Sequence, residues 1–508
     1  MERFERSATT AGWALFALWV WAPLAGWFAA PFTVPAHEVM GLILPGARRA
    51  GLLAETLAYA AGVAALATVV GVAAALYCWR RDESLAWLAE RTALLAAPIP
   101  PYLHALAWLP LFAALPAHGA GGIVGWITAG WVQTLALLPF CFGLARLALE
   151  DLDPRWIEAG RVFGPDRRLL VRVLLPALRP AAFAALALAF LLTLADPSVP
   201  SLFSKSTYSM EVFSEFSATH DAARSMLLAT PLALAGLLAL VPVGRYWRAV
   251  AQRPAMAGAR PAPFAVAGVD LFLLRSGAAL TVLPALALMA ALLKQAWPIS
   301  DWGASLSDGL GSASLSAAAA LIAAAAACLP ALAVSKVVAA WPKTTWWLVS
   351  APLAAPAGLA GAGLIWLWNR NLPVTPYGTF WMLVLAALAR FTPLAVLAVA
   401  AWRGRLDPLL VDAAEVFAAP RRAFLRVVLP QLAPGLAAGA AVVFALSLGE
   451  LGASLLVAPP GASTLALRIY NYLHYGASGS VAALALCLMG ATAVAVLAAT
   501  WLWRTWRD

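Results

Sequence analysis

Long apolar runs of roughly 20 residues recur along the whole chain, separated by short polar segments. Such runs suit a bilayer core of about 30 Å, where only helices or closed barrels satisfy the backbone. The runs are rich in Ala and Leu and do not alternate in polarity, which favours helices over a barrel. The pattern predicts an all-α polytopic membrane protein of about 12 transmembrane helices. We expect the spans at about 11–31, 53–79, 92–115, 121–146, 180–198, 225–244, 276–296, 314–335, 345–368, 377–401, 433–457 and 479–503. The third span contains the prolines of 97–101, which predict a kink.

The composition agrees with this class, because 63% of the residues are hydrophobic and only 11% are charged. The net charge of +10 needs no nucleic-acid partner. If both termini are cytoplasmic, most Lys and Arg fall in cytoplasmic loops, as the positive-inside rule requires. The first apolar stretch is longer than a signal-peptide core of about 7–15 residues, so we expect it to be a retained span. The four cysteines lie within predicted spans and form no CxxC pair, which indicates small buried side chains rather than a metal site.

The chain also repeats itself once, at an offset of 254 in its 508 residues. Residues 152–180 align with 406–434 without a gap, and 14 of the 29 aligned positions are identical. Each half holds six predicted spans, and an even number makes the repeats parallel, related by an axis along the membrane normal. We expect a first six-helix domain at 1–248, a basic cytoplasmic linker at 249–265 and a second six-helix domain at 266–508.

The repeated segment is a polar loop between the fourth and fifth span of each half, at 150–176 and 404–430. An Asp-Pro pair, at 153–154 and at 407–408, is typical of a helix N-cap followed by proline at N1, so each loop is predicted to form a helix–turn–helix. A basic loop contacting lipid headgroups would explain the arginines that follow. It would not explain acidic and small residues held at one spacing in both copies, which favour docking of another protein. The candidate docking residues are Glu158, Ala159, Gly160, Gly164, Asp412, Ala413, Ala414 and Ala418.

These loops resemble the EAA motif of permease subunits of ATP-binding-cassette (ABC) importers, a pattern close to E-A-A-x-x-x-G with a late L-P. The first copy reads Glu158-Ala159-Gly160, Gly164 and Leu175-Pro176, and the second reads Asp412-Ala413-Ala414, Ala418 and Leu429-Pro430. The resemblance implies the type I importer permease fold, with each loop forming a coupling helix in a groove of one of two ABC ATPase subunits. ATP would bind to those partners. The chain has no GxxxxGK[ST] phosphate loop, so we expect a transport subunit without an ATPase site or cofactor of its own.

Three charged residues lie in or beside predicted spans. Asp196 and Glu450 occupy equivalent places near the ends of apolar runs, and Arg390 lies within a span. A charge at such a position is costly unless it faces protein or water, which makes these residues candidates for a translocation pathway. Two carboxylates facing one pathway would favour a cation. Helix capping or an interhelical hydrogen bond is the structural alternative for both, and Glu450 is a possible partner of Arg390.

The outer segments 196–200 and 448–476 look like the fused two-domain permeases of the ferric-ion import group. This resemblance implies a multi-pass protein of the bacterial inner membrane, to which a periplasmic or lipid-anchored binding protein delivers a small solute. Ferric iron is the substrate it favours, with thiamine, phosphonate and polyamine as related alternatives. A secondary transporter with six plus six parallel spans is the rival from another class, but it leaves the repeated loop unexplained. A membrane-embedded enzyme is disfavoured, because nothing catalytic repeats or clusters.

Overall fold

A computed structural model describes most of the chain. The described residues are 2–79, 84–113, 123–150, 152–162, 164–251, 266–296, 302–340, 344–370, 373, 375–404, 406, 408–417, 419–475 and 478–505. This described part is helical and contains no strand, so the predicted all-α class is confirmed. Residues 252–265, which make up most of the expected linker, lie outside it.

Nine stretches of the described chain are long and apolar enough to cross a membrane. Their main helices are α1 (Glu2–Phe16), α2 (Ala22–Ala29), α4 (Ala47–Trp79), α7 (Ile123–Glu150), α10 (Leu175–Ala195), α15 (Gly268–Ala296), α16 (Trp302–Ala340), α19 (Trp381–Arg403), α22 (Leu429–Leu448) and α25 (Ser478–Thr505). The first stretch also includes the π-turn η1 (Ala17–Trp21) and the 3₁₀ turn η2 (Ala30–Phe32), and the second begins with α3 (Ala36–Ile43).

Three further stretches pass only as pairs of helices that bend sharply at a short break. They are α5 (Ser84–Ala96) with α6 (Pro101–Ala113), bent by 112°, α13 (Ala222–Leu228) with α14 (Thr230–Ala251), bent by 48°, and α17 (Thr344–Ser350) and η4 (Ala351–Ala354) with α18 (Ala357–Trp368), bent by 94°. The predicted kink in the third span is confirmed, and it is a full break because three prolines within 97–101 interrupt the helical hydrogen bonds. The predicted twelve spans are reached if each bent pair counts as one span.

Two predicted spans end earlier than the hydropathy pattern indicated. The fifth ends at Ala195, just before an Asp-Pro pair, instead of at 198. The eleventh ends at Leu448 instead of at 457, because the Gly-rich segment 449–453 leaves the helix there. Short helices follow both ends: α11 (Ser198–Leu202), α12 (Tyr208–Thr219), α23 (Ser454–Val457) and α24 (Leu465–Tyr475). The breaks coincide with Asp196 and Glu450, single charged residues that a hydropathy window averages out.

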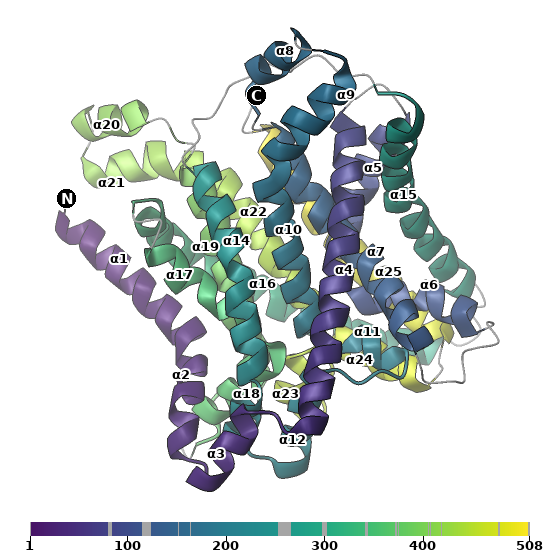
Figure 1. Ribbon diagram of the computed structural model, residues 1–508. Coiled ribbons are helices and arrows are strands. Elements are labelled where there is room, and N and C mark those ends of the chain that lie inside the picture. The colour runs from purple at the N-terminus through teal and green to yellow at the C-terminus, as the bar shows by residue number, and fades with distance from the viewer. Residues whose placement is uncertain are drawn as a thin grey trace.

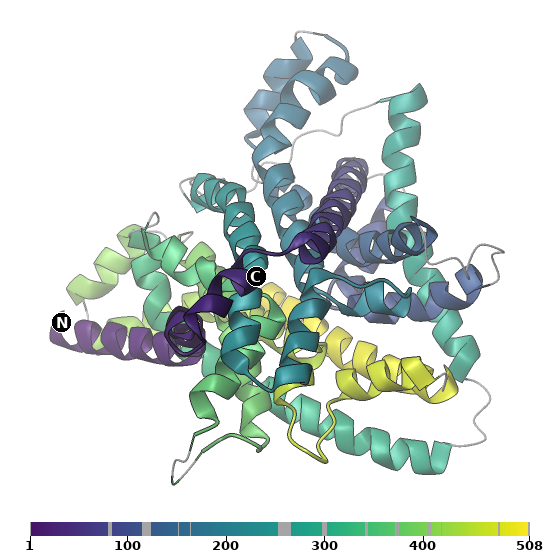
Figure 2. The ribbon, with the colours of Figure 1, turned by 60° about the horizontal axis from the view of Figure 1, so that its bottom comes forward.

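The first long helix of each half packs against the other half of the chain. Helix α1 lies along α16, and α15 lies along α4. Figure 2 shows α1 and α15 on opposite sides of the bundle. Small residues make these crossings close: a Cβ on Gly277 would lie 2.9 Å from the backbone nitrogen of Ala74. Close approach of this kind is how helices associate without a hydrophobic drive in lipid.

Candidate functional site

The two repeated loops fold into the same succession of elements at the same 254-residue offset. The first loop forms α8 (Pro154–Val162), α9 (Asp166–Leu169) and the π-turn η3 (Leu170–Leu174) before α10. The second forms α20 (Pro408–Phe417), α21 (Pro420–Ala423) and the π-turn η5 (Phe424–Val428) before α22. Each loop is therefore a pair of short helices joined to a spanning helix through one π-turn. Figure 1 shows α8 and α20 at the same end of the molecule, away from α11, α23 and α24.

Helix α8 is packed against the bundle on one face and exposed on the other. The Asp153 carboxylate accepts a hydrogen bond of 2.9 Å from the Arg155 amide, which caps the helix as the sequence predicted. Ile157 is 1% exposed and anchors α8 in a cluster with Leu169 and Leu174. On the other side Trp156 is 62% exposed.

The candidate docking residues of the first loop divide between that outer face and the turn. Glu158 and Ala159 are exposed, whereas Gly160 is half-buried against α9. Gly164 lies in the turn at φ +147°, a conformation that side-chain-bearing residues rarely adopt. The small residues thus differ in what they do: Ala159 places only a methyl group on the exposed face of α8, and Gly164 permits the backbone conformation of the turn.

The second loop presents a matching face where it is described. Ala413 is exposed and Ala414 half-buried, like their counterparts in α8. Val416 is 78% exposed, and its equivalent Val162 is 81% exposed. The side chain of Asp412 and the whole of Ala418 lie outside the described residues. Large apolar side chains left bare at one register in both copies are typical of a surface that another protein covers.

At the opposite end of the spanning helices, each candidate pathway carboxylate accepts a hydrogen bond from a backbone amide at the start of the short helix that follows it. One oxygen of Asp196 accepts hydrogen bonds from the Ser198 amide, at 2.9 Å, and from the Ser198 hydroxyl. Glu450 is 7% exposed and accepts a hydrogen bond of 2.7 Å from the Ala453 amide. Both carboxylates therefore bond to the backbone of the segment that follows their spanning helix, although the N-cap residues of α11 and α23 are Pro197 and Ala453.

The structure pairs Glu450 with Arg390, which donates a hydrogen bond to its second oxygen. Arg390 belongs to α19, and its side chain is 19% exposed. The pair joins α19 to the segment after α22, and the guanidinium also lies over the ring of Phe391, 5.2 Å from its centroid. Burial makes this attraction strong, because little water screens it.

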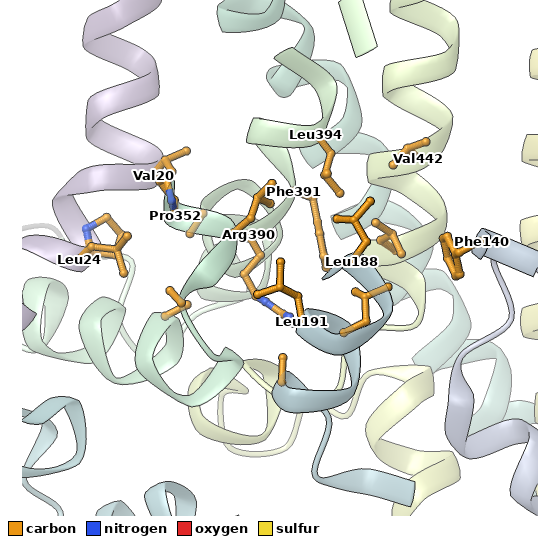
Figure 3. Close-up of a pocket in the computed structure, with 18 of the residues that line it drawn as sticks. Val20, Leu24, Phe140, Leu188, Leu191, Pro352, Arg390, Phe391, Leu394 and Val442 are labelled. Atoms are coloured by element: carbon orange, nitrogen blue, oxygen red, sulfur yellow. The ribbon is translucent and has the colours of Figure 1, made fainter. Parts of the chain in front are cut away.

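A cavity of about 280 Å³ lies beside this pair, between elements of the two halves. Figure 3 shows Arg390 in its middle, next to Leu188 and Leu191 of α10. The other walls come from η1, α2, α7, η4, α18 and α22. Among the described residues that line it, Arg390 carries the sole charge, and neither Asp196 nor Glu450 is part of the wall. The structure thus brings Arg390 and Glu450 together and leaves Asp196 apart from the cavity.

Buried polar residues that the sequence analysis did not select lie on α6, α7 and α24. Gln133 of α7 and Tyr102 of α6 are each 1% exposed, and their polar side-chain atoms have no hydrogen-bond partner in the described structure. Tyr470 of α24 pairs with the Ser201 hydroxyl at 3.0 Å. Burial raises the pKa of Tyr470, the bond to Ser201 lowers it and the charge of Asp196 raises it, so the phenol stays protonated at neutral pH. A Gln within a predicted apolar span was the available signal for this group.

No group of three or more His, Cys, Asp or Glu side chains within the described ranges could hold a metal ion. The two regions thus differ in character: exposed short helices lie at one end, and charged and polar side chains in a low-dielectric interior lie toward the other.

Comparisons with known proteins point to one class. The chain is 29% identical over 154 residues to a permease protein of a 2-aminoethylphosphonate transport system of Salmonella typhimurium, covering 30% of this chain and 58% of the relative. It is 26% identical over 157 residues to a putrescine transport system permease protein of Escherichia coli, covering 29% and 54%. It is 36% identical over 125 residues to a sulfate transport system permease protein of Escherichia coli, covering 22% and 44%.

Each match spans roughly half the length of the relative, so it supports a permease of the ABC importer type for part of the chain. No family model and no solved structure matches the chain. The relatives carry a phosphonate, a polyamine and sulfate in their names, and ferric iron is not among them.

Proposed function

We propose that this chain is the transmembrane permease subunit of a binding-protein-dependent ABC importer. The observation that carries the proposal is the pair of exposed short helices α8 and α20, built in one register and placed at one end of a membrane bundle. A lipid-facing loop would not need small residues beneath bare apolar side chains at the same positions of both copies. The names of the relatives support the same class.

In this proposal two copies of a separate ABC ATPase bind α8 and α20, and ATP binds to those partners. Closure of the ATPases draws the two loops together, and the π-turns η3 and η5 pass that movement to α10 and α22. A periplasmic or lipid-anchored binding protein delivers the solute at the opposite end, in the bacterial inner membrane, with both chain termini cytoplasmic. The chain then acts as two fused permease domains, 1–248 and 266–508.

The solute is a small polar molecule or ion. The resemblance of the outer segments to ferric-ion and thiamine permeases favours ferric iron, whereas the names of the matched relatives favour a phosphonate, a polyamine or sulfate. We therefore treat ferric iron as one candidate of several.

The test is co-purification with the ABC ATPase encoded nearest to this chain. Ala159→Trp together with Ala413→Trp places bulk on the exposed faces of α8 and α20, where no packing is disturbed. We expect ATPase association to fall at least tenfold, because a groove that fits an alanine cannot accept an indole. Ala50→Trp, at an exposed position of α4 outside both loops, is the matched control.

Normal association of the doubly substituted chain would overturn the docking assignment. Uptake that follows an ion gradient without any ATPase would instead establish the secondary transporter.

A further inference from the structure

A chain of ion pairs ties four elements together at one end of the molecule. The elements are α3, the first turn of α4, α12 and α13, and Figure 1 shows α3 and α12 at the end opposite α8 and α20. Three arginines alternate with three glutamates, so the six side chains carry no net charge. We call them the outer ion-pair network; its members, each paired with the next, are Arg48, Glu211, Arg49, Glu215, Arg224 and Glu38.

Helix α12 carries the centre of this network. Glu211 and Glu215 lie four residues apart, so they share one face of the helix. Arg49 of α4 lies against both, with N···O distances of 3.1 Å to Glu211 and 2.9 Å to Glu215. The other oxygen of Glu215 lies 3.2 Å from Arg224 of α13. The side chains of the two glutamates are 16% and 11% exposed, so water screens these pairs less than it screens pairs on an open surface.

The second half holds its equivalent helix, α24, in a different way. At the 254-residue offset the positions of Glu211 and Glu215 are occupied by Leu465 and Ile469. These two side chains are 2% and 0% exposed, and they belong to an apolar cluster with side chains of α15 and α25. The face that meets the bundle is therefore charged in α12 and apolar in α24.

Apolar contacts bury only the first half of α12. Tyr208 and Val212 are 0% and 1% exposed. In the stretch 213–219, all of which the structure describes, every residue is half-buried or exposed. The second half of α12 therefore depends on the two ion pairs of Glu215. Dissolved salt screens partly exposed charges, whereas it does not weaken apolar packing.

The turn after α12 is strained. His220, the C-cap of the helix, has a φ of +55°, in the left-handed region that side-chain-bearing residues seldom adopt. Its equivalent in the second half is also a histidine, His474, and that residue lies within α24 in the helical conformation. A histidine at this position therefore does not require the left-handed turn. Residues of this kind beside a helix end are places where a hinge can absorb a change of φ and ψ.

We propose that the outer ion-pair network is an electrostatic latch on the second half of α12. When its pairs break, residues 213–220 lift away from α4 and α13, with the change of backbone angle taken up at His220. Tyr208 and Val212 keep the start of the helix in place, and α24 stays packed. This end of the molecule thus has one segment that can be released and one that is fixed. The latch is a property of the chain alone and does not depend on the proposed importer function.

The test is hydrogen–deuterium exchange of the purified full chain in detergent, without ATPase, read by mass spectrometry. Peptides that cover 213–220 report on the latch, and peptides that cover 465–475 report on α24. Glu215→Gln keeps the size of the side chain and breaks both of its ion pairs. We expect exchange in 213–220 to be at least tenfold faster in this variant and exchange in 465–475 to be unchanged.

Salt provides a second perturbation that needs no substitution. Raising NaCl from about 0.05 M to about 1 M should speed exchange in 213–220 severalfold in the wild-type chain, and less in Glu215→Gln, because the screened pairs are already broken there. Glu90→Gln is the matched control, because it makes the same chemical change and breaks a pair with Arg146, whose N···O distance is 2.9 Å, outside the network. That control should leave exchange in 213–220 unchanged. If Glu215→Gln does not fold, Arg224→Gln takes its place.

The proposal is overturned if the variant leaves exchange in 213–220 unchanged, because the network would then be a static tie. A salt effect of equal size in the wild-type chain and in the variant would also contradict it. Equal acceleration in 465–475 would mean that the whole bundle opens, which is incompatible with a latch on α12 alone.

Discussion

Replacing Glu450 by Gln tests whether the Arg390 pair is an important tie within the bundle. The side chains of Glu450 and Arg390 are 7% and 19% exposed, so both charges are largely removed from water. The glutamine carbonyl can still accept the hydrogen bond that the Ala453 amide now gives at 2.7 Å. The substitution therefore removes the negative charge and little else.

The expected cost follows from the burial of the pair. Removing one partner of a buried ion pair costs about 3–5 kcal/mol, because the other charge is left uncompensated. Arg390 lines the cavity, where water can partly solvate it, so we expect the lower end of that range, about 3 kcal/mol. Adding Arg390→Met to Glu450→Gln removes the stranded charge and should recover at least about 1.5 kcal/mol.

The free energy of unfolding can be followed by denaturant titration in detergent, with intrinsic fluorescence from the 23 tryptophans. Asp270→Asn is the matched control, because it breaks a surface pair with Arg167, whose side chain is 75% exposed. That control should cost less than about 1 kcal/mol. The reasoning is refuted if Glu450→Gln costs no more than Asp270→Asn, or if the double variant is no more stable than Glu450→Gln alone.

Three further predictions concern packing and backbone, each read as the free energy of unfolding in the same titration. Gly71→Ala should destabilise by about 1–3 kcal/mol, because its Cβ would lie 2.7 Å from a backbone nitrogen of α7. Gly62→Ala on the same helix is the control and should not destabilise, because no atom lies within 4 Å of the position of its Cβ. Ile157→Ala should cost about 2–5 kcal/mol, because Ile157 is buried, and Trp156→Ala should cost under about 1 kcal/mol, because Trp156 is exposed. Equal costs would mean that the buried side chain of Ile157 does not anchor α8. Gly164→Ala should cost about 1–3 kcal/mol because of its φ of +147°, and a neutral result would contradict that turn.

How much of the candidate site could be predicted from the sequence depends on how far apart its residues lie along the chain. The two loops could be found from the sequence because every residue of each loop lies within one short segment, and the repeat marks the segment twice. Their cap, their small residues and their place between spans are local properties. The partner of Arg390 is 60 residues away along the chain. The cost of an unpaired charge in lipid made Glu450 a reasonable partner for Arg390, but the sequence pattern could not single it out among the carboxylates.

The buried polar side chains of Gln133, Tyr102 and Tyr470 could not be selected from the sequence for the same reason. Gln133, Tyr102 and Tyr470 lie on α7, α6 and α24, and nothing in their own segments indicates how deeply each is buried. Only the packing of those helices removes Gln133 and Tyr102 from solvent and pairs the Tyr470 hydroxyl with Ser201.

The sequence by itself determined the all-α membrane class, the approximate spans and the two repeated helical loops, because hydropathy, capping and repetition act over short stretches of chain. Only the tertiary structure decided the packing of α1 and α15 on the opposite halves. It also decided that one acid of the pseudo-equivalent pair has a cationic partner and the other has none among the described residues. These features depend on which surfaces meet, and that choice is made by close contact between helices far apart in the chain.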